Sequence, residues 1–184
     1  MGSKEINIKF TQEQVKKYND QGSRLCFSAA IAGNVNISWA DQYKIAATKD
    51  KFSEGVKFKI STNTAIINFA EVYTLPRDWS DGTISKGGVK DAFKFVNKTT
   101  GVASAVIYKR INGQDLPFYI STSPVDSDGN EVMTPKSVVA LWFQKDAETG
   151  TMTSVNKSDV SIFDFANRSS INLKWDNCHF IEDN

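Results

Sequence analysis

Short apolar or alternating stretches recur along this chain from one end to the other. Examples are Ala105-Val106-Ile107-Tyr108, Phe118-Tyr119-Ile120-Ser121 and Ile171-Asn172-Leu173-Lys174-Trp175. A period of two places alternate side chains on opposite faces of a sheet, so each stretch has one face to bury and one to expose. The pattern therefore predicts a protein built mainly of β-strands.

The strands are expected to be connected by short turns, without internal repeats or interleaved helices. The main candidates are residues 6–10, 24–32, 35–39, 43–47, 56–60, 65–75, 93–96, 102–111, 116–122, 137–145, 152–155, 160–165 and 171–175. Such a series predicts an all-β fold, a single-domain antiparallel β-sandwich of roughly ten strands over residues 1–184, with a closed barrel as the alternative.

Two glycine-containing dipeptides predict tight hairpins. Asn112-Gly113 is typical of a type I′ turn and joins residues 102–111 to 116–122. Gly33-Asn34 predicts that residues 24–32 pair with residues 35–39.

One short helix is expected near the N-terminus. Thr11 precedes Gln14 by three residues, the spacing of a capping box, and Gly22 stands where a helix would end. We expect a helix over residues 12–20 with Val15 and Tyr18 on its inner face.

Composition and charge narrow the class of protein. The 184 residues are 40% hydrophobic and carry a formal net charge of +1, with no basic block, which argues against a nucleic-acid-binding surface. The N-terminal residues do not form the apolar core of a signal peptide, and no stretch is long and apolar enough to be a transmembrane segment. We therefore expect a cytoplasmic protein in which Cys26 and Cys178 are reduced, buried thiols and its Asn-X-Ser/Thr sequons carry no glycan.

No catalytic residues, metal ligands or cofactors can be assigned. Cys178 and His179 are adjacent, but neighbours on a strand point to opposite faces, so they would not form a catalytic pair. Asp126, Asp128, Asn130 and Glu131 place oxygen atoms at alternate positions, as calcium loops do. The EF-hand pattern fails, however, and a turn between strands explains the same residues. The chain thus favours a protein without enzymatic activity.

The most informative loop covers residues 76–88, where the strand pattern stops. It contains Trp79 between polar residues, with Arg77, Asp78 and Asp81 nearby. An aromatic ring in a polar loop either folds back over the sheet or offers a flat face to a ligand. We predict that Trp79 stacks on a ligand and that Arg77, Asp78 and Asp81 supply hydrogen bonds.

These observations favour a non-enzymatic, lectin-like protein that binds a carbohydrate or the lipid headgroups of a membrane surface through its end loops. One alternative is a structural or self-assembling β protein with no small ligand, a homo-oligomer associating through its sheet edges. Another is a small-molecule-binding or enzymatic sandwich with an unrecognised pocket.

Overall fold

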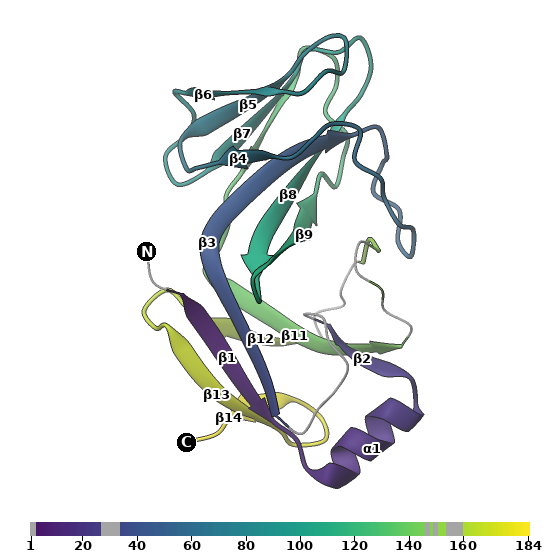
Figure 1. Cartoon of the computed structure of the whole chain (residues 1–184), viewed down its shortest axis with the longest axis vertical. Coiled ribbons are helices and arrows are strands. Elements are labelled where there is room, and N and C mark those ends of the chain that lie inside the picture. Colours follow the sequence, from purple (N-terminus) through teal and green to yellow (C-terminus); the bar gives the residue numbers. More distant parts are fainter. Residues whose placement is uncertain (1–2, 27–33, 146–147, 149–150, 154–159) are drawn as a thin grey trace. The chain divides into compact units, whose positions relative to one another are not determined.

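The computed structural model describes residues 3–26, 34–145, 148, 151–153 and 160–184. Fourteen strands and one helix lie within these residues (Figure 1), so the predicted all-β class with one short N-terminal helix is confirmed. The chain divides into two compact units. Unit 1 contains the described residues of 3–40, 137–148 and 160–184, and unit 2 contains 41–136 and 151–153. That residues 1–184 form one domain stays a prediction.

Unit 1 combines two groups of strands with the helix. Its elements are β1 (Lys4–Lys9), α1 (Gln12–Asp20), β2 (Ser23–Cys26), the first part of β3 (Asn34–Thr48), β11 (Val138–Lys145), β12 (Ser161–Asp164), β13 (Ser170–Trp175) and β14 (Phe180–Glu182). One group has the order β14-β13-β1-β3 and the other the order β12-β11-β2. The β1–β13 pair is parallel, with Ile6 opposite Ile171.

The helix begins as its sequence predicts. The Thr11 hydroxyl accepts the backbone N–H of Gln14, and the Gln14 side chain accepts the backbone N–H of Thr11. Tyr18 is buried as expected, but Gln14 rather than Val15 is the second buried residue. Gln14 is buried because its side-chain amide also donates to the Trp175 carbonyl oxygen at 2.9 Å, which attaches the helix to the end of β13.

Aromatic side chains from distant parts of the sequence form the core beside this helix. Phe143 of β11 stacks on Tyr18 with ring centroids 4.5 Å apart and contacts Trp175 edge-on at 4.9 Å. Phe180 packs on both Phe143 and Trp175. Aromatic packing therefore joins α1 to the C-terminal strands.

Unit 2 is a sandwich of two sheets. Its elements are the second part of β3, β4 (Ala65–Ile67), β5 (Glu71–Leu75), β6 (Thr83–Lys86), β7 (Phe93–Asn97), β8 (Ser104–Ile111), β9 (Gln114–Ile120) and β10 (Asn130–Met133). One sheet contains β3, β4, β8 and β9, and the other has the order β10-β7-β5-β6. Buried residues of both sheets form one hydrophobic core, with Tyr43, Ile45 and Ile107 from the first and Tyr73, Phe93 and Phe95 from the second. This confirms the predicted sandwich packing.

The hairpin between β8 and β9 forms as predicted. Asn112 and Gly113 both have positive φ angles, 47° and 78°, and Ile111 pairs with Gln114. These are the φ signs of a type I′ turn, which Asn-Gly adopts readily.

Several predictions for unit 2 differ from the structure. Residues 56–60 form no strand. Side chains rather than a neighbouring strand bind the backbone of Lys59: the Asp50 carboxylate accepts its N–H at 2.7 Å, and the Thr48 hydroxyl donates to its carbonyl oxygen at 2.6 Å. Residues 65–75 form two strands, β4 and β5, with a turn at Ala70, where φ is 62°. The predicted loop over residues 76–88 contains β6, and β5 and β7 are parallel rather than antiparallel.

The predicted pairing of residues 24–32 with residues 35–39 is wrong for the residues of these two segments that the structure describes. Leu25 in β2 pairs with Phe143 in β11, whereas Ile37 in β3 pairs with Ile6 in β1. Residue 33 and residues 154–155 of the predicted strand 152–155 lie outside the described residues. The short strands β10 and β14 were not predicted, because their apolar runs are too brief to show a period.

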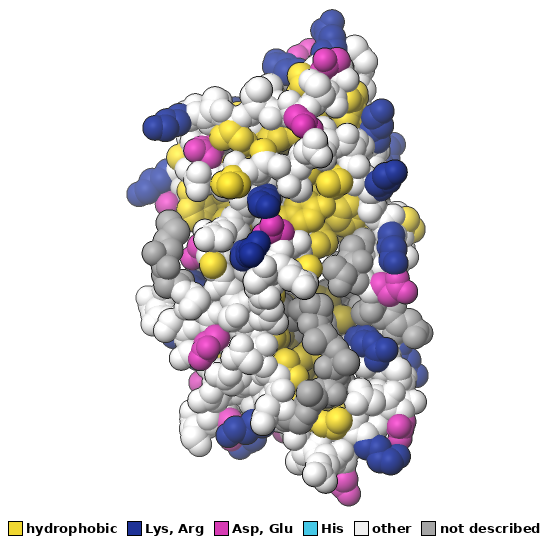
Figure 2. All heavy atoms as spheres, in the orientation of Figure 1, with side chains coloured by type: hydrophobic (Ala, Val, Ile, Leu, Met, Phe, Trp, Pro, Cys, Tyr) yellow, Lys and Arg dark blue, Asp and Glu magenta, His cyan; other side chains and the backbone are white. Residues whose placement is uncertain are grey.

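The surface carries mixed charges. Figure 2 shows basic and acidic side chains interspersed over the face in view. Among the residues that the structure describes, no helix has the length and apolar character needed to cross a bilayer. The cytoplasmic location stays a prediction.

Candidate functional site

Three connecting segments meet at one end of the four-stranded sheet in unit 2. Leu75 at the end of β5 pairs with Asn97 at the end of β7, so the segments that follow both strands leave the sheet at this end. Asn130, the first residue of β10, pairs with Val96, which brings the preceding segment to the same place. We call this the loop end and define it as residues 76–82, 98–103 and 121–129. It is the sort of loop cluster on a rigid scaffold where binding sites are common.

Trp79 lies at the loop end and is half-buried. Its indole packs against the hydrophobic core of unit 2, and the Lys49 ammonium lies 4.9 Å from the centre of its ring. The backbone of Trp79 has a φ of 60°, the left-handed region that a bulky residue seldom occupies. The sequence left two possibilities for Trp79, a ring folded back over the core and a ring exposed to a ligand. The structure combines them, because the side chain packs on the core and is still partly accessible to solvent.

The neighbouring acidic residues are hydrogen-bonded locally. Asp81 accepts the side-chain amide and the backbone N–H of Asn63, both at 2.8 Å. Asp78 accepts the hydroxyl and the backbone N–H of Ser80. These bonds hold the pKa of both carboxyl groups below the usual value, so both are charged at neutral pH.

Arg77, the fourth predicted site residue, is exposed. The structure therefore places Arg77, Asp78, Trp79 and Asp81 at one end of the sheet. It shows Asp78 and Asp81 bound to Ser80 and Asn63 rather than to Trp79. The contribution of Asn63 and Lys49 was not predicted, because both are distant from the loop in sequence and only the fold brings them there.

Gly82 ends the segment in close contact with the core. Its N–H donates to the Tyr73 hydroxyl at 3.2 Å, and a Cβ at this position would lie 2.2 Å from the Tyr73 ring. The same hydroxyl is 3.1 Å from that of Thr62. Only glycine lets the chain approach the tyrosine so closely, which fixes where the loop rejoins the sheet.

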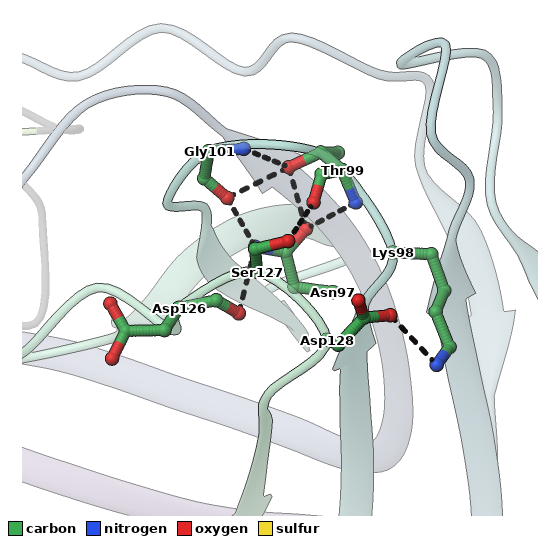
Figure 3. Close-up of polar contacts among 7 residues, drawn as sticks. All are labelled: Asn97, Lys98, Thr99, Gly101, Asp126, Ser127 and Asp128. Carbon is green, nitrogen blue, oxygen red and sulfur yellow. Dashed lines mark hydrogen bonds and ion pairs between the residues drawn. The ribbon is translucent and has the colours of Figure 1, made fainter.

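A buried asparagine joins the two other segments of the loop end (Figure 3). The Asn97 side-chain amide donates to the carbonyl oxygens of Gly101, Val125 and Asp126 at 2.8, 2.9 and 3.2 Å, and its side-chain oxygen accepts the N–H and hydroxyl of Thr99. Ser127 adds a hydrogen bond to the Thr99 carbonyl oxygen. The Asn97 sequon is thus folded into the interior, and its side chain is unavailable for glycosylation in the native state.

The oxygen-rich segment 126–131 is not arranged as an ion cage. Asp128 pairs with Lys98 at 3.0 Å, and the Asp126 carboxylate points away from the Asn97 network (Figure 3). Glu131 accepts hydrogen bonds from the hydroxyls of Tyr119 and Ser121. Within the described ranges, no group of three or more His, Cys, Asp and Glu side chains could hold a metal ion.

An open cavity of about 360 Å³ lies beside these residues. It is lined by residues 122–126 and 129–131, whose side chains include hydroxyl, amide and carboxylate groups. Burial and the hydrogen bond to Glu131 raise the pKa of Tyr119 to about 12, so its phenol stays protonated and donates to the carboxylate next to the cavity.

The two cysteines are free thiols in different surroundings. Cys26 is half-buried, whereas Cys178 is exposed, which corrects the prediction that both are buried. The backbone N–H groups of Cys178 and His179 both donate to the Asp176 carboxylate in the turn between β13 and β14. These contacts are those of a turn and do not form a nucleophile–base pair.

Comparison of the chain with protein-family models, with curated proteins and with solved structures finds no match.

Proposed function

We propose that this protein is a non-enzymatic recognition protein that binds carbohydrate at the loop end of unit 2. The observation that carries the proposal is Trp79, a large aromatic held with a φ of 60° at the point where three segments meet. A bulky residue in this region costs conformational energy, and such residues are concentrated at ligand-binding positions.

The chemistry of the loop end suits a sugar. The flat, apolar faces of pyranose rings stack on indole rings, while their hydroxyls require both donors and acceptors. The Lys49 ammonium lies over the Trp79 ring, and because a lysine side chain is flexible, a sugar can displace it from the ring face. The cavity beside residues 122–131 supplies the hydroxyl, amide and carboxylate groups.

Pre-organisation supports the same function. Asn97 ties two of the segments together, and Asp81 ties the third to Asn63. Loops that are ordered before binding lose less entropy when the ligand arrives, so a modest contact area is sufficient for binding.

A glycan array followed by calorimetry with the best-bound glycan tests the proposal. Trp79→Ala should weaken binding by about 1 to 3 kcal/mol, the range for an aromatic hot spot, and Trp79→Phe should restore part of it. Phe69→Ala, which removes an aromatic at the other end of the sheet, is the control and should leave the affinity unchanged. The melting temperature of each variant separates lost binding from unfolding, since Trp79 also packs on the core.

Two results would contradict the proposal. One is a glycan array on which the folded wild-type protein binds nothing. The other is a folded Trp79→Ala variant that binds the selected glycan as tightly as the wild type.

A further inference from the structure

The opposite end of the four-stranded sheet forms a second surface. Glu71 at the start of β5 pairs with Lys86 at the end of β6 and with Phe93 at the start of β7. The turn before β5 and the segment between β6 and β7 therefore meet at this end. We call it the turn end and define it as residues 68–70 and 86–94.

The backbone of the turn end is held in place. The Gly88 N–H donates to the Ala70 carbonyl oxygen at 2.8 Å, and the Ala70 N–H donates to the Ala92 carbonyl oxygen at 2.9 Å. A Cβ on Gly88 would lie 2.8 Å from the Glu71 carbonyl oxygen, so the two segments approach as closely as glycine permits. The side chains of the turn end therefore project from a backbone that is fixed by hydrogen bonds.

Two apolar side chains of the turn end face solvent. Val89 is 48% exposed and Phe69 is 37% exposed. The Phe69 ring stacks on Phe93 at 5.1 Å, so one face is packed and the remainder is open. Both residues lie on the two hydrogen-bonded segments, and exposed apolar side chains grouped on one part of a surface often mark an interaction site.

The turn end also carries three lysines. Lys86 and Lys90 are exposed and Lys94 is partly exposed. Of the two acidic residues here, Asp91 is exposed and Glu71 accepts the N–H and side-chain amide of Asn68.

We propose that the turn end docks on the surface of an anionic phospholipid bilayer, with Val89 and Phe69 entering the headgroup region and Lys86, Lys90 and Lys94 facing the lipid phosphates. Apolar tips flanked by basic side chains are complementary to such a surface, because burial in the interface and attraction to anionic lipids act together. This surface lies at the other end of the sheet from the loop end, so the inference does not depend on carbohydrate binding.

Vesicle sedimentation tests the inference. The full chain is mixed with vesicles of phosphatidylcholine alone or with about 30% phosphatidylserine, an anionic content that gives a negative surface potential. The wild type should sediment with the anionic vesicles and stay in solution with the neutral ones, and added salt should release it. Lys90→Glu should lower the partition coefficient about tenfold or more, since each basic charge near such a surface contributes about fivefold.

Matched variants control for charge and hydrophobicity. Val89→Asp should weaken binding strongly, whereas Val56→Asp alters a valine that is equally exposed, at 48%, and should have little effect. Lys51→Glu makes the same charge change as Lys90→Glu at an exposed lysine outside the turn end and should stay within about twofold of the wild type. Circular dichroism verifies that each variant is folded.

The inference is overturned by any of three results. These are a wild type that does not bind anionic vesicles, equal binding to neutral and anionic vesicles, or folded Lys90→Glu and Val89→Asp variants that bind like the wild type. Trp79→Ala should leave vesicle binding intact, so failure of this inference and failure of carbohydrate binding are distinguished.

Discussion

The side-chain amide of Asn97 donates a hydrogen bond of 2.9 Å to the backbone oxygen of Val125, 28 residues further along the chain. Asn97 is fully buried, and its amide N–H groups are shared among three backbone oxygens of two different segments. One side chain thus reinforces the antiparallel backbone bridge that Ala103 and Val125 form between the same two segments. Such a network is sensitive to any change that leaves its buried acceptors without donors.

Asn97→Ala should lower the free energy of unfolding by about 3 kcal/mol, because it removes the five hydrogen bonds of a buried side chain and leaves the Thr99 N–H without its acceptor. Urea denaturation measures the effect. Asn63→Ala is the control at an exposed site: it removes the hydrogen bond from the side-chain amide to Asp81, keeps the one from the backbone N–H, and should cost about 1 kcal/mol or less. Equal losses for the two variants would show that burial of the Asn97 network contributes nothing.

Gly82→Ala should destabilise unit 2 by about 2 kcal/mol or more, since the added methyl group would overlap the Tyr73 ring. Gly101→Ala provides the comparison, because a Cβ at that position meets no atom within 4 Å. Thermal denaturation of both variants tests the difference. A Gly82→Ala variant as stable as Gly101→Ala would refute the close packing of Gly82 on Tyr73.

Leu141→Ala should cost about 2 to 5 kcal/mol, the range for removing a buried leucine and leaving a cavity. Leu141 is fully buried, whereas Ile162 on the adjacent strand β12 is 58% exposed. Ile162→Ala should therefore cost under about 0.5 kcal/mol. Guanidinium titrations of both variants test this, and a cost for Leu141→Ala no larger than that for Ile162→Ala would disprove the assigned face of β11.

The two thiols should differ in reactivity toward iodoacetamide at about pH 8, where an ordinary thiol is partly ionised. Burial raises the pKa of Cys26 to about 11, so in the native protein Cys178 should be alkylated much faster. Peptide mass spectrometry at timed intervals measures the alkylated fraction of each cysteine. After denaturation without reductant, both cysteines should be alkylated. Faster alkylation of Cys26, or a disulfide between the two residues, would contradict this.

The raised pKa of Cys26 also predicts a pH dependence of stability. The folded state holds the thiol proton more tightly than the unfolded state, so the contribution is fully present below the unfolded pKa of about 9 and is lost as the pH rises through about 11. Cys26→Ser removes this titration. Its free energy of unfolding should therefore fall less than that of the wild type between these pH values, and identical pH profiles would exclude the effect.

Local signals in the sequence predicted individual elements well. The capping box of Thr11 and Gln14 and the Asn112-Gly113 turn depend on residues a few positions apart, so their hydrogen bonds and φ angles follow from nearby residues alone. Alternation likewise located β1, β7, β11 and β13, because burial of one face requires a period of two. The same pattern at residues 56–60 wrongly predicted a strand, because the side chains of Asp50 and Thr48 bind backbone groups that a neighbouring strand would otherwise bind.

Sequence alone thus determined the β class, the helix and the polar loop that holds Trp79, because each depends on local periodicity or turn chemistry. Only the tertiary structure decided which strands pair, as when β2 joins β11 rather than β3, and only it brought Asn63 to Asp81 and Lys49 to Trp79. Pairing partners far apart in sequence leave no periodic signal, since the energy of a sheet comes from cross-strand contacts that form only when the chain folds.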